Sequence, residues 1–458
     1  MTALSSLNST SSFAVTSLAD TAATASTGSV ASEEAAAESA SAMVTIPSAG
    51  VESLVIYTPD GAMAGAPPIT TWARDNSDAI SQVMASDYLA DSVSGQFHNL
   101  GSALLDRFMT TGSDYSQSVS VGSVGQSIAS STQSPQSDIN LTVQTASGVK
   151  VDIEIQSGNG TLGVTIHSSG TLTGTERNAL AGLADGFQKA IDGLSVQPPT
   201  LDLSGLMQYD PSVLSSVNMQ FKLAGNTLFG VSGNFSANNS ARSVSLTDWA
   251  GTMNLKVDTS QSALWGSGAQ RSAAIASYLK QFDNANTQGH GNAAFMGLFK
   301  DAFTQLNSNV GTASQAATPW LGQPEQAMLT GLGDFTASIS DAGDTVGTQA
   351  NTFSYQVSQS TSTDGDAVSQ VQQSHLKASY REVLSSSAYD DVVVDDDASS
   401  TVKLAMEKGV LIHASLTQSS TQSTRNSEYV DGKLVSDVTT PWNMSASTDL
   451  LRKLQSER

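Results

Sequence analysis

Asp152 and His167 are the residues of this chain that could most readily perform acid–base chemistry together. Alternating apolar residues flank each of them, and an Asn159-Gly160 pair separates the two stretches. An Asn-Gly pair between alternating stretches predicts a two-residue hairpin turn, which places Asp152 directly opposite His167. A carboxylate beside an imidazole can move a proton or bind a metal ion. The alternative is a cross-strand ion pair on an exposed sheet face, which is the commoner arrangement.

An acidic run is the second candidate, because Asp390, Asp391 and three further aspartates surround Val392, Val393 and Val394. Hard cations such as Ca²⁺ favour several carboxylates on one loop. The spacing fits no EF-hand loop, and the sequence has no glycine-rich nonapeptides of the calcium-binding type. The metal-ligand candidates are therefore Asp395, Asp396 and Asp397, but the preferred interpretation is a solvated acidic surface loop.

Residues 158–163 spell the G-x-G-x-x-G string of dinucleotide-binding proteins. That chemistry requires a helix to begin at the last glycine, because the amide groups of the helix N-terminus hold the pyrophosphate. Residues 164–167 instead continue an alternating pattern, which predicts a strand. The sequence therefore predicts a hairpin at this position and no nicotinamide cofactor, and it indicates no other cofactor.

Other catalytic motifs are missing from the sequence. The five histidines are scattered without an H-E-x-x-H motif, and there is no Walker A string and no G-x-S-x-G elbow. With no cysteine, the chain has no disulfide, no thiolate metal site and no cysteine nucleophile. These absences favour a non-enzymatic protein and leave an enzyme with an unfamiliar site as the alternative.

The elements around Asp152 and His167 are the clearest in the chain. Three alternating stretches over residues 138–168 predict an antiparallel meander, with Gly148 in the left-handed conformation of the first turn. Thr173 and Glu176 form a capping box, which predicts a helix to about residue 194 that covers the meander.

The remaining elements give a fold class of α+β, with antiparallel meanders and hairpins and with segregated helices. The predicted elements are a helix over 76–108, strands over 213–257, helices over 269–340, long hairpins over 351–440 and a short helix over 448–454. Two Asp-Gly pairs, at 364–365 and 431–432, predict hairpin turns within similar eight-residue segments. Whether these two segments are a duplication stays open.

Four parts are expected along the chain. They are a disordered Ser/Thr/Ala-rich tail over 1–45, a helix-plus-meander unit over 46–200, a strand-rich then helical unit over 201–345 and a long-hairpin unit over 346–458. The tail contains no Lys or Arg and has too few large apolar residues to offset the entropy cost of ordering it.

The negative net charge of the chain limits the classes of partner that it can bind. Forty-two acidic and 20 basic residues give a net charge of −22. Nucleic acids and anionic membranes both select clustered Lys and Arg, so neither is expected as a partner. No run of 18 apolar residues occurs, so no membrane span is expected. A protein partner stays open, and so does the oligomeric state.

In composition, the tail resembles the Ser-rich N-termini of type III and flagellar export substrates. That resemblance implies a bacterial protein that leaves the cell without a signal peptide. The resulting hypothesis is a non-enzymatic protein, exported or surface-associated, that acts through protein or surface contacts. The alternative is a cytoplasmic enzyme or a small-ligand-binding protein whose site no motif reveals.

Overall fold

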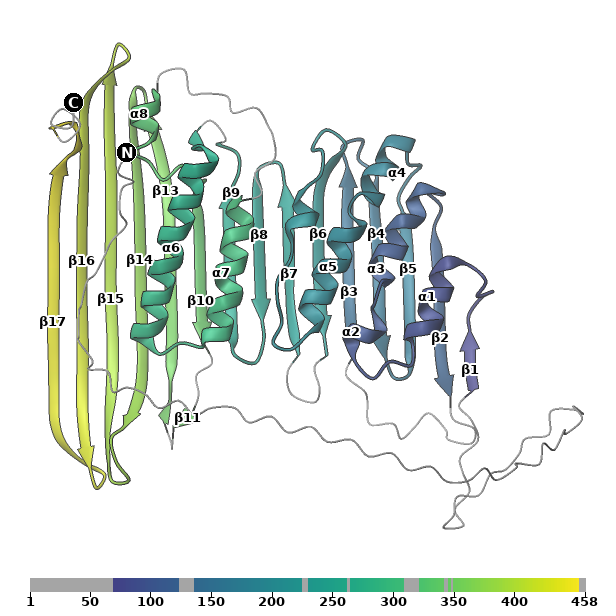
Figure 1. The fold of residues 1–458 in the computed structure, drawn as a ribbon, viewed down its shortest axis with the longest axis horizontal. Helices are drawn as coiled ribbons and strands as arrows, with labels where there is room; N and C mark the ends of the chain where they lie inside the picture. Colours follow the sequence, from purple (N-terminus) through teal and green to yellow (C-terminus); the bar gives the residue numbers. More distant parts are fainter. Residues whose placement is uncertain are drawn as a thin grey trace, which may run out of the picture. The chain divides into compact units, whose positions relative to one another are not determined.

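The computed structural model describes residues 69–122, 136–224, 230–261, 264–308, 321–341, 345–346 and 349–452. The predicted tail over residues 1–45 lies outside these described residues. The main element is a 15-stranded antiparallel sheet (Figure 1), in the order β1-β2-β5-β4-β3-β6-β7-β8-β9-β10-β13-β14-β15-β16-β17. Two short strands, β11 (Thr345–Val346) and β12 (Gln349–Ala350), pair separately.

The predicted meander over residues 138–168 is confirmed as β3, β4 and β5, and two further strands, β1 and β2, extend the sheet beyond β5. The strands are β1 (Ile69–Trp72), β2 (Tyr115–Gly122), β3 (Ser137–Thr145), β4 (Lys150–Gly158) and β5 (Thr161–Ser168). Val143 pairs with Val151, and Ile153 pairs with Ile166, so apolar residues of neighbouring strands lie opposite each other on one face. Gly148 has φ 95°, which confirms the left-handed conformation of the first turn.

Four strands continue the sheet and confirm the strands expected over 213–257. They are β6 (Leu214–Leu223), β7 (Val231–Asn238), β8 (Ala241–Thr247) and β9 (Gly251–Asp258). The next strand, β10 (Phe335–Asp341), lies where a helix was expected, so that prediction is wrong. Phe335 and Ile339 are four residues apart, a spacing that fits one face of a helix or of a strand. Ala337, which is buried between them, shows that every second residue faces the core, as in a strand.

Long strands make up the C-terminal part of the sheet. They are β13 (Thr352–Asp364), β14 (Ala367–Val383), β15 (Ala388–Glu407), β16 (Val410–Val430) and β17 (Lys433–Asp449). The β13–β14 and β16–β17 hairpins confirm the two predicted ones, although the first turns at Gly365-Asp366, one residue later than predicted. The Asp431-Gly432 turn takes φ values of 50° and 71°, and Lys408-Gly409 takes 51° and 77° between β15 and β16. After β17, residues 450–452 are helical.

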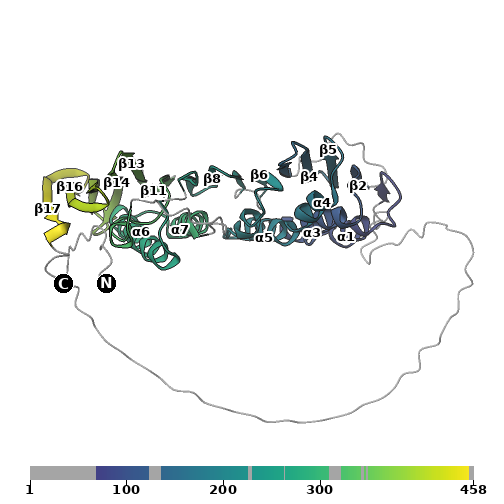
Figure 2. The same ribbon diagram turned by 90° about the horizontal axis from the view of Figure 1, so that it is seen from above.

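Helices lie on one face of the sheet, over the strands from β2 to β14 (Figures 1 and 2). They are α1 (Ala79–Asp87), α2 (Val93–Gln96), α3 (Leu100–Asp106), α4 (Gly174–Ala181), α5 (Ala184–Ser195), α6 (Gly268–Gly289), α7 (Ala293–Ser308) and α8 (Gln323–Gln326), with short 3₁₀ helices at Arg107–Met109 and Ser204–Met207. Alternate strand residues and the apolar sides of α1, α3, α4, α5, α6 and α7 form one large core. Residues of β14, β15 and β16 form a second, smaller cluster with Leu321, Met328 and Leu450. The observed fold is therefore α+β, with helices beside an antiparallel sheet.

Local capping explains how the helices differ from the predicted ones. The single helix expected over 76–108 is wrong, because Ser92 caps α2 and Asn99, with φ 55°, precedes α3. The capping box is confirmed, with Thr173 and Glu176 bonding each other's backbone amide. The helix that begins there has a break between α4 and α5.

Candidate functional site

The face of the sheet away from the helices carries mostly polar side chains, with Val383 and Val393 as exposed apolar exceptions on the C-terminal strands. Apolar residues alternate with polar ones along the strands, and the apolar set points to the helix-covered core. The figures show no labelled helix over the other face (Figure 2). We call this helix-free side of the sheet the open face.

Two neighbouring rows of directly paired residues cross the open face from β5 to β17. The first row is His167, Asp152, Thr142, Asn218, Ser236, Ser243, Lys256, Thr336, Ser358, Gln373, Ser399, Ser419 and Ser445. The second row is Thr165, Glu154, Asn140, Gln220, Asn234, Ser245, Asn254, Ser338, Gln356, His375, Asp397, Thr421 and Asn443. Every member of both rows is polar or charged, and most carry a hydroxyl or an amide group.

A shallow groove runs over the middle of these rows. Its volume is about 890 Å³, and strands β7 to β16 contribute to its lining. Residues at its centre include Asn254, Ser338, Gln356 and Ser358, and His375 and Asp397 also line it. The groove therefore offers many short hydrogen-bonding groups and few charges.

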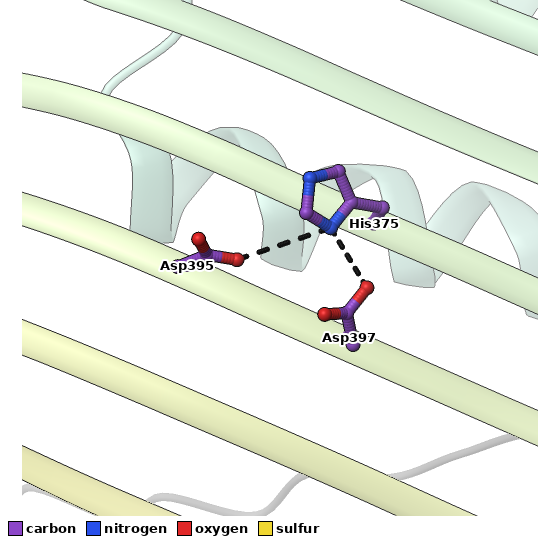
Figure 3. A group of neighbouring side chains, drawn as sticks. All are labelled: His375, Asp395 and Asp397. Atoms are coloured by element: carbon purple, nitrogen blue, oxygen red, sulfur yellow. Dashed lines mark hydrogen bonds and ion pairs between the residues drawn. The ribbon is translucent and has the colours of Figure 1, made fainter.

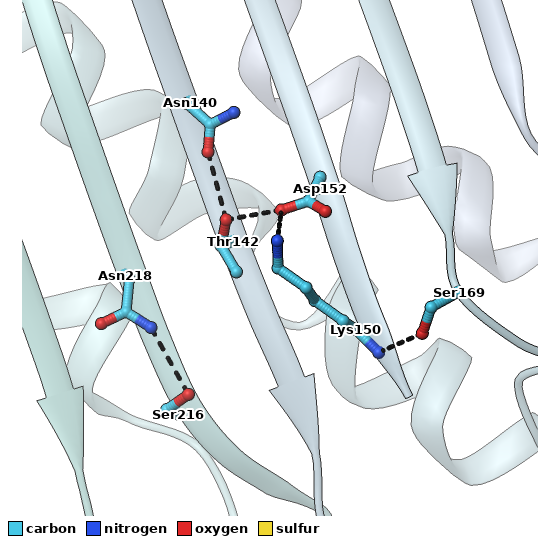
Figure 4. Close-up of polar contacts among 7 residues, drawn as sticks. All are labelled: Asn140, Thr142, Lys150, Asp152, Ser169, Ser216 and Asn218. Carbon is cyan, nitrogen blue, oxygen red and sulfur yellow. Dashed lines mark hydrogen bonds and ion pairs between the residues drawn. The ribbon is translucent and has the colours of Figure 1, made fainter. Parts of the chain in front are cut away.

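The predicted pairing of Asp152 with His167 is confirmed as a register, since the two residues are direct cross-strand partners. Each side chain nevertheless contacts a different group. The Asp152 carboxylate accepts a hydrogen bond of 2.6 Å from the Thr142 hydroxyl. It also forms an ion pair of 2.9 Å with the Lys150 ammonium group (Figure 4). His167 Nδ1 lies 3.0 Å from the carboxylate of Asp114.

The electrostatics of Asp152 suit a carboxylate that stays ionised. Burial raises its pKa, but hydrogen bonds from Thr142 and Lys150 outweigh that effect and leave the pKa below its ordinary value. A general acid or base near neutral pH requires the opposite shift. The geometry therefore favours a network of surface ion pairs and hydrogen bonds at this position.

The acidic run is not a loop, contrary to the preferred prediction, because residues 390–397 lie inside the long strand β15. Its three central valines alternate with the pleat, and Val392 and Val394 are buried in the core. Asp395 and Asp397 consequently lie on the open face, whereas Asp396 lies on the helix-covered face. Burial raises the pKa of Asp396, although hydrogen bonds from Gln288 and Ser420 oppose that effect.

His375 completes a cluster with the two open-face aspartates (Figure 3). His375 Nδ1 lies 2.8 Å from an oxygen of Asp397 and 3.9 Å from an oxygen of Asp395. The three candidate ligand atoms all lie within 4.8 Å of one another. Lys377, which is paired with Asp395 in the strand register, places its Nζ 3.8 Å from that carboxylate.

The sequence does not indicate that His375, one of the five scattered histidines, lies beside the aspartates. This proximity depends on the register of β14 and β15, which pairs His375 with Asp397. The alternation of Val392 and Val394 with polar residues is the signal that could have revealed the strand. It also indicates that Asp396 points to the opposite face of the sheet from Asp395 and Asp397.

No protein family, curated protein or solved structure matches this chain. Among the described residues, no helix combines the length and apolar character needed to cross a lipid bilayer.

Proposed function

We propose that this chain is a non-enzymatic bacterial binding protein, exported or surface-associated, which acts through contacts made by the open face of its sheet. The observation that supports the proposal is the pair of polar rows that cross this face around a groove of about 890 Å³. The partner is a macromolecule or surface that hydrogen-bonds to hydroxyl and amide groups.

The side-chain chemistry of the rows favours contact over simple solvation. Serine, threonine and asparagine both donate and accept hydrogen bonds, so they can pair with either kind of group on a partner. Their short side chains also lose less rotamer entropy on contact than Lys or Glu, which commonly occupy a sheet face that only meets water. The lining of the groove contains such short side chains, among them Ser243, Ser338 and Ser358.

Composition supports the exported location. The chain has no cysteine and only 20 basic residues among 458. The Ser/Thr/Ala-rich segment over residues 1–45 resembles export signals in composition. The alternative proposal, a small-ligand-binding protein or an enzyme inside the cell, would use the same groove without export.

The first experiment tests the location by fractionating cultures that express the full chain and a chain without residues 1–45. The full chain is expected in the medium or on intact cells, and the shortened chain is expected to stay inside. Confinement of the full chain to the cytoplasm would contradict export and favour the alternative proposal.

The second experiment tests the open face by measuring how much purified full-length protein intact bacterial cells retain. Ser338→Glu with Ser358→Glu is expected to reduce retention at least fivefold, because two charges would stand in the groove. The control carries the same added charge at two exposed positions of α6, Ser272→Glu with Ala273→Glu. Equal retention of both double variants would contradict a role for the open face.

A further inference from the structure

We propose that His375, Asp395 and Asp397 form a binding site for a divalent transition-metal cation at the border of the open-face groove. The three residues project from two neighbouring strands onto the same face. His375 and Asp397 also line the groove, so an ion bound there would be accessible to a second molecule.

The geometry fits three ligands of one ion. Ligand atoms on neighbouring positions of an ion with bonds of about 2.1 Å lie about 3.0 Å apart in octahedral and about 3.4 Å apart in tetrahedral geometry. His375 Nδ1 and the Asp397 carboxylate oxygen, 2.8 Å apart, need to separate by only a few tenths of an ångström to reach this range. Asp395, at 3.9 Å from the same nitrogen, requires only a side-chain rotation to approach. All three ligand atoms lie within 4.8 Å of one another.

The ligand types select the class of ion. One imidazole nitrogen and two carboxylate oxygens suit Zn²⁺, Mn²⁺, Co²⁺ or Ni²⁺, with water at the remaining positions. Ca²⁺ instead takes six to eight oxygen ligands, and Mg²⁺ prefers carboxylates and water. An imidazole in the set therefore argues against both of these hard cations.

The strand ladder positions the ligands before an ion arrives. Asp395 and Asp397 are two residues apart on β15, so both side chains point to the open face. His375 on β14 is the direct partner of Asp397. Exposed side-chain fractions of 36% for His375 and 41% for Asp395 leave the site accessible from solvent.

Lys377 is the natural competitor of a bound ion. Its ammonium group lies 3.8 Å from the Asp395 carboxylate and neutralises part of the local negative charge. A cation that takes Asp395 as a ligand must displace this contact. Removing the Lys377 charge should therefore strengthen metal binding, whereas it would have no such effect if the cluster served only as a cross-strand ion pair.

A single His–Asp pair elsewhere on the open face serves as the internal comparison. His167 contacts Asp114 at 3.0 Å, which resembles the contact of His375 with Asp397. His375 has two carboxylates nearby, whereas among the residues that the structure describes no second carboxylate joins His167 and Asp114 in a comparable three-residue cluster. Comparing metal affinity between His375 and His167 variants therefore measures what the second aspartate, Asp395, adds to metal binding.

The test is calorimetric titration of the full-length, chelator-treated protein with Zn²⁺ and separately with Mn²⁺. One ion per chain is expected to bind, and His375→Gln or Asp397→Asn should each weaken binding by at least about tenfold. The control His167→Gln should leave the affinity unchanged. Circular dichroism and the urea midpoint would verify that these exposed substitutions preserve the fold.

Lys377→Gln supplies the decisive second measurement, with an expected increase in affinity of at least about threefold from removal of a neighbouring positive charge. Absence of saturable binding, or equal losses in the His375 and His167 variants, would overturn the metal site. The proposed cell-contact function does not depend on this result, because retention by cells is measured separately and without added metal.

Discussion

Arg381 and Asp391 lie directly opposite each other on β14 and β15 and are joined by two parallel hydrogen bonds of 2.7 and 2.8 Å. The guanidinium carbon also lies 3.7 Å from the ring centre of Tyr389, which stacks on Tyr429. Both charged side chains are partly buried, with exposed fractions of 13% and 21%. Hydrogen bonds from Arg381 to Asp391 raise the pKa of the guanidinium further above its ordinary value.

The first prediction follows from this geometry. Arg381→Lys should lower the free energy of unfolding by about 1 kcal/mol, because a lysine cannot make the two-bond contact or stack equally well on the ring. Urea denaturation at neutral pH measures the change.

A matched pair in the same sheet provides the control. Arg425 makes an equivalent two-bond contact with Asp437, but their side chains have exposed fractions of 55% and 36%. Arg425→Lys should therefore change the free energy of unfolding much less than Arg381→Lys does, because solvent screens an exposed ion pair. Equal effects of the two substitutions would contradict the role assigned to burial and to the tyrosine.

The second prediction concerns acid and Glu176 at the start of α4. Hydrogen bonds from the Ser147 hydroxyl and from the Thr173 backbone lower the pKa of Glu176 from 4.5 to about 2. A depressed folded-state pKa gives stability that is fully present above about pH 4.5 and is lost as the pH falls through about 2. Glu176→Gln should therefore destabilise the protein at pH 7 and have a progressively smaller effect toward pH 2.

The measurement is the urea midpoint of the wild type and of Glu176→Gln at intervals from pH 7 down to pH 2. Glu407→Gln is the control, because that side chain is exposed at the end of β15. A difference between wild type and Glu176→Gln that stayed constant with pH would show that the ionised carboxylate is not the stabilising form.

The meander shows which features the sequence could predict. The turn residues Asn159 and Gly160 and the alternation of apolar residues predict the turns and the register of β3, β4 and β5. A slip of one residue would move every apolar side chain of a strand to the exposed face. The Thr173–Glu176 capping box could also be predicted, because its two residues are only three positions apart in the sequence. In each case the residues that decide the structure lie within a few positions of one another.

The incorrect predictions arise where the decisive contact is distant in sequence. Residues 335–339 form a strand because β10 pairs with β9 and β13, although the spacing of their large side chains also fits a helix. The metal cluster likewise depends on the long pairing of β14 with β15. Propensity could not identify the acidic run as a strand, because aspartate is depleted in strands and is accepted here through its cross-strand partners.

The third prediction concerns the aromatic core between the helices and the sheet. Phe282 is fully buried, and its ring contacts those of Phe299, Phe303 and Tyr355 at centroid distances of 5.0, 5.1 and 6.0 Å. Phe282→Ala should lower the free energy of unfolding by about 3–5 kcal/mol, because it removes these contacts and leaves a cavity. Trp442→Ala on β17, where 44% of the residue is exposed, should have a much smaller effect in the same urea measurement. Similar losses would contradict the assignment of the core to α6 and its neighbours.

The final prediction tests the turn that sets the register of the candidate acid–base pair. Asn159 and Gly160 have φ values of 53° and 71°, as a two-residue type I′ turn requires. A Cβ atom at Gly160 would also lie 3.2 Å from the backbone oxygen of Val121. Gly160→Val should therefore lower the free energy of unfolding by about 1–3 kcal/mol, since a β-branched residue is strained at this φ.

Gly297→Ala is the matched control, because Gly297 lies inside α7 and a Cβ atom there would meet nothing within 4 Å. That substitution should stabilise the protein by about 0.5–1 kcal/mol through helix propensity. Opposite signs for the two glycines in urea denaturation would confirm that Gly160 is required by the turn, whereas Gly297 is not required by its helix. A Gly160→Val variant as stable as the wild type would contradict the turn, and with it the register that places Asp152 opposite His167.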